Sequence, residues 1–250
     1  MPRRLRSTPL ALALASFALL AGLGARSAEA ERTGACPDGM VAIDDRSCID
    51  RYEASLEQLD EEGRVLGAHP PNQPVAGRRV RATNERLGAP QAYVTQLEAK
   101  AACEAAGKRL CTDREWVAAC KGPLGTRYPY GERRREGACN DRGTEPLAAL
   151  GARAEAISTW SFDAMNDPRL YRVAGSIAPS GRFDRCQSEL GAHDLVGNLH
   201  EWTADPEGTL RGGYFLDTTT LGEGCDYVAV GHDAHYRDYS TGFRCCADPR

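Results

Sequence analysis

The pattern of apolar and polar residues begins with an uncharged apolar run over residues 10–23, and three arginines stand among the six residues at the N-terminus. Ala28-Glu29-Ala30 follows as a small-x-small sequence, which is typical of a signal-peptide cleavage site. The run is shorter than the roughly 20 apolar residues that cross a bilayer, and no later segment is long or apolar enough to do so. We therefore interpret residues 1–30 as a signal peptide rather than a membrane anchor, and place one domain over residues 36–250.

A first helix is predicted to begin after Thr95. Thr95 and Glu98 have the spacing of a capping box, in which the hydroxyl accepts from the backbone at the third helical position and the carboxylate reaches back to the cap. Leu97, Ala101 and Ala105 then recur at helical spacing. The glycine at position 107 can end the helix in the left-handed conformation.

A second helix is predicted a few residues later by the same signal. Thr112 and Glu115 form another capping box, and Trp116 and Cys120 share one helical face at a four-residue step. A Gly-Pro pair at residues 122–123 stops the helix.

The rest of the chain shows no long helical period. Short β-type runs such as residues 212–216 alternate with glycine, proline and aspartate. The polar stretch 57–81, which contains three prolines, predicts a surface excursion because proline removes backbone donors and charged side chains resist burial. The pattern as a whole predicts a single α+β domain dominated by loops.

Composition and charge narrow the classes of function. The chain has 250 residues, of which 42% are hydrophobic and 26% charged, with a formal net charge of −4. Removal of residues 1–30 would take away four arginines and one glutamate and make the domain more acidic. We expect no nucleic acid and no anionic membrane as partner, because a negative surface gives no general attraction to either.

The ten cysteines all follow Ala35. This distribution is typical of an oxidising compartment, so we expect a periplasmic or secreted protein. The spacing alone allows on the order of 945 pairings and does not decide the connectivity.

Several short motifs occur in a fixed order along the chain. They are Met40-Val41, residues 49–53 (IDRYE), 106–110 (AGKRL), 115–116 (EW), 128–131 (YPYG), 191–202 (GAHDLVGNLHEW), 210–213 (LRGG) and 242–245 (GFRC). In this order and at this spacing they resemble the formylglycine-generating enzyme, or sulfatase-modifying factor, domain family. The resemblance covers roughly residues 36–248.

The resemblance implies a variant of the C-type lectin fold, an α+β architecture with a small twisted sheet, two helices and long loops fixed by calcium and disulfides. It also implies that Cys103 pairs with Cys245 and Cys120 with Cys225. Elimination and proximity leave three further expected pairs, Cys111–Cys246, Cys36–Cys48 and Cys139–Cys186.

The oxidases of this family bind copper through two cysteines that follow the paired glycines of the RGG motif, since copper(I) requires soft thiolate ligands. In this sequence Asp217 and Gly222 occupy those two positions. A carboxylate does not replace a copper(I) thiolate, and glycine supplies no ligand. We therefore expect no formylglycine-type oxidation, no catalytic residues of that kind and no copper or iron.

The resemblance implies a calcium site between residues 194 and 201. Its ligands would be the side chains of Asp194 and Glu201 and the backbone carbonyls of Gly197 and Leu199, because hard oxygen donors suit calcium. The alternative is a turn with two solvated carboxylates.

A second calcium site is a weaker expectation. It would use Asn140 and the carbonyl of Asp141, completed by Asp163 or Asp167.

A transition-metal site is a further hypothesis for the segment 232–238. His232 and His235 stand three residues apart, with Asp233, Tyr236 and Asp238 nearby, and imidazole suits copper, iron, nickel or zinc. The alternative is a pair of solvated histidines in an acidic loop.

The sequence favours an exported, monomeric binding or accessory module for an unidentified protein, peptide or glycan. Its binding surface would lie between the loop after Gly213 and residues 225–241. Aromatic contact area there would come from Trp202, Tyr214, Phe215, Tyr227, Tyr236 and Tyr239, some of which belong to the core. The alternative is an extracytoplasmic metal-dependent oxidoreductase, with a remodelled site at His232 and His235 or with formylglycine formation by another cysteine pair.

Overall fold

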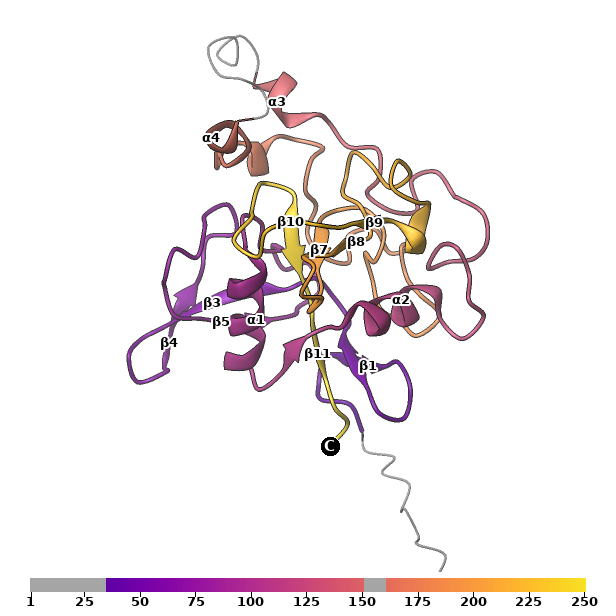
Figure 1. Cartoon of the computed structure of the whole chain (residues 1–250), viewed down its shortest axis with the longest axis horizontal. Helices are drawn as coiled ribbons and strands as arrows, with labels where there is room; N and C mark the ends of the chain where they lie inside the picture. Colours follow the sequence, from indigo (N-terminus) through magenta and orange to yellow (C-terminus); the bar gives the residue numbers. More distant parts are fainter. Residues whose placement is uncertain (1–34, 151–160) are drawn as a thin grey trace, which may run out of the picture. The chain divides into compact units, whose positions relative to one another are not determined.

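The computed structural model describes residues 35–150 and 161–250 (Figure 1). The predicted signal peptide therefore lies outside the described residues. The described residues form one compact unit. None of the helices within the described ranges has the length and apolar character needed to cross a membrane.

The two predicted helices are present with the predicted caps. Helix α1 spans Gln96–Ala105 and helix α2 spans Asp113–Lys121, and each begins at a threonine with a complete capping box. Short helical turns α3 (Pro146–Ala149), α4 (Phe162–Met165), η2 (Leu170–Arg172) and η3 (Gly224–Asp226) lie in the loops. Both long helices were therefore predicted correctly from local capping signals.

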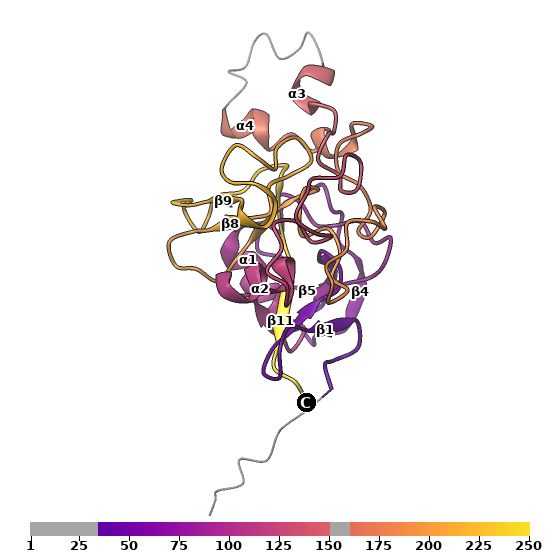
Figure 2. The same ribbon diagram turned by 90° about the vertical axis from the view of Figure 1, so that its right-hand side faces the viewer.

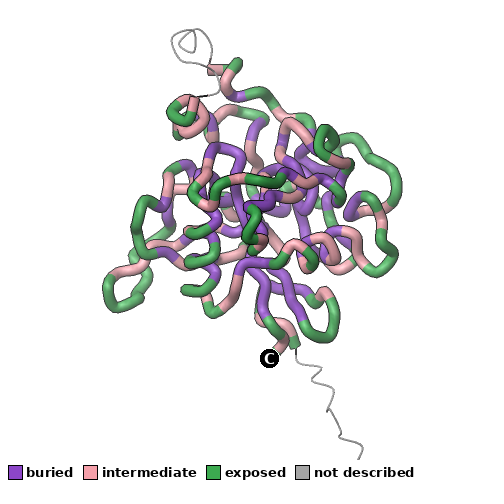
Figure 3. Tube along the Cα trace, in the orientation of Figure 1, coloured by how far each residue is buried: buried purple, intermediate pink, exposed green. Residues whose placement is uncertain are grey.

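The face of α1 that enters the core is not the face that the sequence suggested. Ala99, Ala102 and Cys103 are buried, whereas the predicted stripe that begins with Leu97 is exposed. Figure 3 shows this alternation of buried and exposed positions along the chain. Cys103 decides the orientation because its disulfide to Cys245 holds that face against the core.

The strands form three short sheets among the described residues instead of the single small sheet that was expected. The first has the order β1 (Met40–Ala42), β2 (Cys48–Asp50), β11 (Cys245–Ala247) and β6 (Arg109–Leu110), and all its pairs are antiparallel. The second has the order β10 (Thr241–Phe243), β7 (His200–Trp202), β8 (Leu210–Arg211) and β9 (Val228–Ala229). The strands β10 and β7 pair in parallel.

The third sheet corrects the interpretation of residues 57–81 as a surface excursion. It consists of β4 (Val65–Ala68), β3 (Ser55–Leu59) and β5 (Val80–Thr83), all antiparallel. Leu56 in β3 and Val80 and Ala82 in β5 are buried in one cluster with α1. The prolines lie between β4 and β5, so they remove no donors from the sheet.

Residues 212–216 were predicted as a β-type run and instead form a turn after β8. Gly212 and Gly213 have φ angles of 81° and 70°. A Cβ atom at Gly213 would stand 2.2 Å from the carbonyl oxygen of Asp217. The paired glycines therefore end the strand and direct the following residues back toward Asp217.

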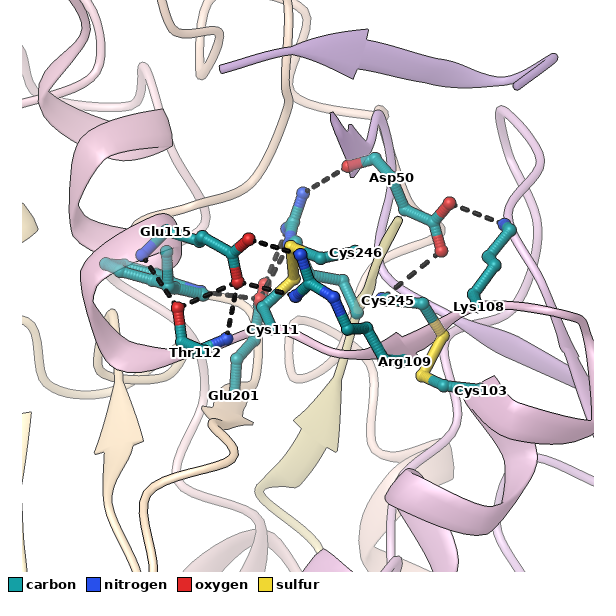
Figure 4. Close-up of a disulfide and its surroundings, with 12 residues drawn as sticks. Asp50, Cys103, Lys108, Arg109, Cys111, Thr112, Glu115, Glu201, Cys245 and Cys246 are labelled. Carbon is teal, nitrogen blue, oxygen red and sulfur yellow. Dashed lines mark hydrogen bonds and ion pairs between the residues drawn. A yellow bond between two sulfur atoms is a disulfide. The ribbon is translucent and has the colours of Figure 1, made fainter. Parts of the chain in front are cut away.

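Five disulfides connect these elements, and they join the same five pairs that the sequence analysis anticipated. Cys245 and Cys246 are adjacent in β11, so their side chains point to opposite faces of the strand. Cys245 is bonded to Cys103 on α1, and Cys246 to Cys111 after β6 (Figure 4). Strand β11 is therefore held on both faces, and it pairs with β2 and β6 in the sheet whose strands β1 and β11 are labelled in Figure 1 and Figure 2.

Candidate functional site

A series of side-chain contacts joins strand β7 to the loop after β8. Nε2 of His200, the first residue of β7, lies 3.4 Å from the hydroxyl of Tyr227. That hydroxyl lies 3.2 Å from Oδ2 of Asp217. On the other side of the ring, Nδ1 lies 3.2 Å from Oγ of Ser240, which precedes β10. The parallel pairing of β7 with β10 brings His200 and Ser240 together.

The series continues from Ser240 to a buried carboxylate. Oδ1 of Asp238 accepts from Oγ of Ser240 at 2.8 Å and from its backbone N–H at 2.7 Å. Oδ2 accepts from the hydroxyl of Tyr236 at 2.6 Å. An imidazole thus lies between two carboxylates, each reached through one hydroxyl. The residues of this His200 network are Tyr236, Asp238, Ser240, His200, Tyr227 and Asp217.

The His200 network contains fewer donor hydrogens than its contacts require. Four contacts need one hydrogen each: Ser240 with Asp238, Ser240 with His200, His200 with Tyr227, and Tyr227 with Asp217. The two hydroxyl groups and a neutral imidazole supply only one hydrogen each. An imidazolium would complete all four contacts, and a neutral ring leaves one acceptor without a hydrogen.

The pKa values of His200 and Asp217 favour a neutral imidazole ring together with an ionised carboxylate. Burial is the main cause that lowers the pKa of His200 to about 3, and His232 lowers it further. Partial burial by itself would raise the pKa of Asp217, but hydrogen bonds from the backbone of Thr219 and Thr220 outweigh burial and lower it. The network is therefore one hydrogen short at neutral pH.

The aromatic residues expected to line a binding surface divide into two groups. Trp202, Phe215, Tyr227 and Tyr239 are buried, and Tyr214 and Tyr236 are half-buried. The ring of Tyr214 stacks on His200 with 4.7 Å between centroids. Asp217 is also half-buried, so Tyr214, Asp217 and Tyr236 all reach the surface in this region.

The two positions that the family resemblance assigns to the oxidase thiols lie in this same loop. Asp217 directs its Oδ2 to Tyr227, and Gly222 has a φ of 115°. A Cβ atom at Gly222 would stand 2.4 Å from the carbonyl oxygen of Asp226. All ten cysteines of the chain are in disulfides, and the described residues contain no free cysteine. The loop therefore presents a carboxylate and a backbone that excludes a side chain.

The residues of the first predicted calcium site lie in the core beside Arg244. Glu201 is buried, and Nη2 and Nε of Arg244 lie 2.5 and 2.6 Å from its two carboxylate oxygens. The indole N–H of Trp116 donates to Oε2 of the same carboxylate at 2.7 Å. Asp194 is also buried and accepts from the backbone N–H of Gly181 at 2.5 Å. Glu201 is thus already paired, and Asp194 has no cationic partner among the described residues.

A third carboxylate increases the negative charge of this region. Glu53 is buried, and its Oε1 and Oε2 accept from the backbone N–H of Leu199 and the side-chain amide of Asn198. Burial is the first cause that raises the pKa of Glu53, and the charge of Asp194 adds to it. Burial likewise raises the pKa of Asp194 to about 7. Three buried carboxylates thus lie near the single guanidinium of Arg244 and leave an excess of negative charge, but within the described residues the three are not placed as one group that could hold a metal ion.

The second predicted calcium site contacts the first predicted site directly. The amide of Asn140 donates to Oδ1 of Asn198 at 2.8 Å, and the carbonyl oxygen of Asn140 accepts from the backbone of Asn198 at 2.9 Å. Oδ1 of Asp141 is buried without a hydrogen-bond partner within the described ranges. Asp167 is instead ion-paired with Arg169. Asp163, the other candidate to complete the site, is exposed on α4.

The two histidines of the hypothetical transition-metal site lie in different environments. His232 is half-buried, with ring centroids 6.2 Å from Trp202 and 5.0 Å from Tyr236. His235 is exposed, and its backbone N–H donates to Asp233. In the part of the chain that the structure describes, no group of three or more histidine, cysteine, aspartate or glutamate side chains is placed to hold a metal.

Several residues that organise these sites had no individual signal in the sequence. Arg244 and Glu53 stand inside quoted motifs, but nothing in a motif indicates that a guanidinium and a carboxylate are buried. Ser240 had no motif, and its role depends on the pairing of two strands that are 40 residues apart.

The chain is similar in sequence to proteins of one known family. The family model for the sulfatase-modifying factor enzyme 1-like domain matches residues 20–249. The chain is 32% identical over 142 residues to the inactive C-alpha-formylglycine-generating enzyme 2 of Bos taurus, covering 54% of this chain and 41% of that protein. It is 30% identical over 199 residues to the formylglycine-generating enzyme of Mycobacterium tuberculosis, covering 66% of this chain and 59% of that protein.

These matches span between about two fifths and three fifths of the length of the two relatives. Among solved structures, the U1 variant of the Major Tropism Determinant superposes with a TM-score of 0.48 at 14% identity, covering 87% of this chain and 54% of that one.

Proposed function

The chain belongs to the sulfatase-modifying factor enzyme 1-like domain family, and from this membership we propose that it is an exported member without formylglycine-generating oxidase activity, acting as a binding or accessory module. The family resemblance inferred from the sequence motifs is thereby confirmed, together with the α+β fold class.

One observation carries the proposal. At the positions where oxidising relatives hold two copper-binding thiols, this chain has Asp217 and Gly222, and the backbone at Gly222 leaves no room for a side chain. Every cysteine is committed to a disulfide, and all the sulfur atoms lie in buried or largely buried residues. Soft thiolate ligands for copper(I) are therefore missing from the described chain.

The oxidase activity is tested directly. The purified protein is incubated with copper, oxygen and a Cys-x-Pro-x-Arg peptide, and aldehyde is trapped with a hydrazine reagent. We expect no aldehyde above the level of a protein-free reaction, whereas an active formylglycine-generating enzyme run in parallel converts the peptide. Intact mass should rise by ten hydrogens on reduction, one for each bridged cysteine. Turnover of the peptide, or two free thiols in the oxidised protein, contradicts the proposal.

The His200 network supports a ligand that brings a hydrogen-bond donor to Asp217. Oδ2 of Asp217 receives a hydrogen only if Tyr227 withholds its hydrogen from His200. A cationic donor would fill this deficit, and charge-assisted hydrogen bonds to a carboxylate are stronger than neutral ones. The half-buried ring of Tyr214 adds an aromatic face against which a cation binds favourably.

The ligand chemistry is tested with a matched pair of probes. N-acetyl-lysine methylamide is compared with N-acetyl-norleucine methylamide by NMR titration, observing the ring signals of His200 and Tyr227. We expect the lysine compound to bind about tenfold more tightly, and Asp217→Asn to abolish the difference. Asp233→Asn, an exposed carboxylate in a neighbouring segment, is the control and leaves the preference intact. Equal binding of both compounds refutes the cationic ligand and leaves the loss of oxidase activity unaffected.

Calcium remains part of the proposal, and Asp194 is the residue that would hold it with the carbonyls of Gly197 and Leu199. The excess of buried carboxylates supports this assignment, although Glu201 would contribute only if Arg244 gave up part of its contact. Because the pKa of Asp194 is raised to about 7, calcium competes with a proton there. We expect calcium to raise the melting temperature more at pH 8 than at pH 5.5, and Asp194→Asn to abolish the increase. The same increase at both pH values speaks against Asp194 as a ligand.

A further inference from the structure

Helix α1 carries a second apolar face that the core does not use. Leu97 is 46% exposed, and Ala101 and Ala105 follow it at four-residue steps, all exposed. The opposite face holds the disulfide of Cys103 and cannot turn outward. The exposed stripe is therefore a fixed feature of the helix.

This stripe forms one side of a groove of about 420 Å³. The other side comes from Leu59 at the end of β3, Val80 at the start of β5, and Val75 in the loop before β5. The helix and the strand β5 are packed together through buried Val80 and Ala99, so the groove has rigid walls.

Positive charge borders the groove. Arg78 and Arg79 both line it and both are exposed. Their Nη1 atoms donate to backbone carbonyls, that of Arg78 to Val75 at 3.2 Å and that of Arg79 to Glu61 at 2.6 Å. Within the described residues neither guanidinium has a carboxylate within ion-pair distance. Their orientation is thus fixed by neutral oxygens, and their charges stay uncompensated.

The acidic residue in the groove, Glu98, is hydrogen-bonded to Ala76 and Thr95 and not to either arginine. One carboxylate oxygen of Glu98 accepts from the backbone N–H of Ala76, and the other accepts from the backbone N–H and hydroxyl of Thr95. Glu98 therefore connects the start of α1 to the loop that carries Arg78 and Arg79. It holds the loop in place and directs its oxygens inward.

We propose that this groove binds an acidic amphipathic helix of a partner protein. The stripe from Leu97 to Ala105 is nine residues long and spans about 12 Å over its eight steps of 1.5 Å, which is about two turns of a facing helix. Alanine at two of its three positions allows helix axes to approach to about 8–10 Å. Apolar side chains at i and i+4 of the partner would fill the groove, and its flanking carboxylates would pair with Arg78 and Arg79. This surface lies on different elements from the His200 network, so the inference does not depend on a ligand there.

The test uses two labelled helical peptides with identical leucines at i and i+4. One carries glutamates beside the leucines and the other carries lysines, and binding is followed by fluorescence anisotropy at low and high salt. We expect the glutamate peptide to bind at least about tenfold more tightly at low salt, with the difference shrinking as salt screens the charges. The double variant Arg78→Glu with Arg79→Glu should reverse the preference.

Two further variants separate groove binding from general attraction. Ala101→Glu places a charge in the apolar floor and should abolish binding of the glutamate peptide, and it tests the site without harming α1 because glutamate is a good helix former. Arg64→Glu changes the same charge on the β3–β4 hairpin outside the groove and should leave binding unchanged. Equal affinity for both peptides, failure of both to bind, or an equal effect of Arg64→Glu overturns the proposal.

Discussion

Arg244 and His200 illustrate how burial acts on single side chains. Arg244 is fully buried, and it donates to Glu201 as well as to the backbone carbonyls of Asp50 and His193. Its positive charge is thus satisfied on every side, and Glu201 depends on it in return. His200 has no such partner, so its ring stays neutral and hydroxyl groups surround it. Two basic side chains, one in β7 and one between β10 and β11, therefore adopt opposite charge states.

Replacing Arg244 with methionine should cost about 3–5 kcal/mol of unfolding free energy, because it leaves the carboxylate of Glu201 buried without its cation. The measurement is urea unfolding of the oxidised protein. Lys100→Met removes an exposed i,i+4 pair with Glu104 and should cost no more than about 0.5 kcal/mol. If the two variants are equally stable, the buried pair has no special role. The double variant Arg244→Met with Glu201→Met should recover part of the loss.

His200 should remain neutral down to about pH 4, because burial lowers its pKa to about 3. An unfolded histidine takes up a proton near pH 6.5, so this residue stabilises the fold most above that pH and loses its contribution as the pH falls toward 3. Through this residue the unfolding free energy changes by up to about 1.4 kcal/mol per pH unit. The variant His200→Gln should therefore reduce the pH dependence of the unfolding free energy over this range. Ring nitrogen shifts measured by NMR check the charge state, and a transition near pH 6.5 would contradict the neutral ring that burial favours.

At the scale of elements, local signals determine where the helices begin, and packing determines which face is used. Thr112 accepts from the backbone of Glu115, and Glu115 also receives two hydrogen bonds from Arg109. The cap of α2 is thereby joined to strand β6, as Figure 4 shows. Several of the short strands behave differently, because they pair with segments far away in the sequence, as β11 does with β2 and β6.

Thr112→Ala should lower the unfolding free energy by about 1 kcal/mol through loss of the side-chain cap on α2. Urea unfolding measures the change. Thr112→Ser keeps the hydroxyl and should restore most of the stability. A serine variant as unstable as the alanine variant would mean that the lost methyl group, and not the cap, explains the effect.

At the scale of the whole molecule, disulfides take the place of extended regular structure. The strands are two to five residues long, and three bridges close loops of more than a hundred residues, with separations of 142, 135 and 105. Such long closures restrict the unfolded chain most in the chain-entropy account. The core clusters around α1 and α2 each contain cysteines from these bridges.

The stabilising effect of each bridge should follow the length of the loop that it closes. Removal of Cys103–Cys245 by paired alanine substitutions should cost about 5 kcal/mol, and removal of Cys36–Cys48, with a separation of 12, about 3 kcal/mol. Chemical unfolding of the two double variants gives the comparison. A larger loss for the short loop would show that native packing, and not chain entropy, sets the order.

The sequence by itself determined the two helix starts and the family membership, and it predicted from the family resemblance that Asp217 and Gly222 stand in place of the oxidase thiols. These features depend on residue identity or on hydrogen bonds within three positions, as at Thr95 and Glu98, so no distant contact is needed to predict them.

Only the tertiary structure decided the exposed stripe of α1, the burial of Arg244 and the His200 network. The network joins residues 27 and 40 positions apart through strand pairing, and the orientation of α1 depends on a bridge to β11. Apolar spacing predicts that a helix has an apolar face, but when two faces are apolar the packed core determines which of them is buried.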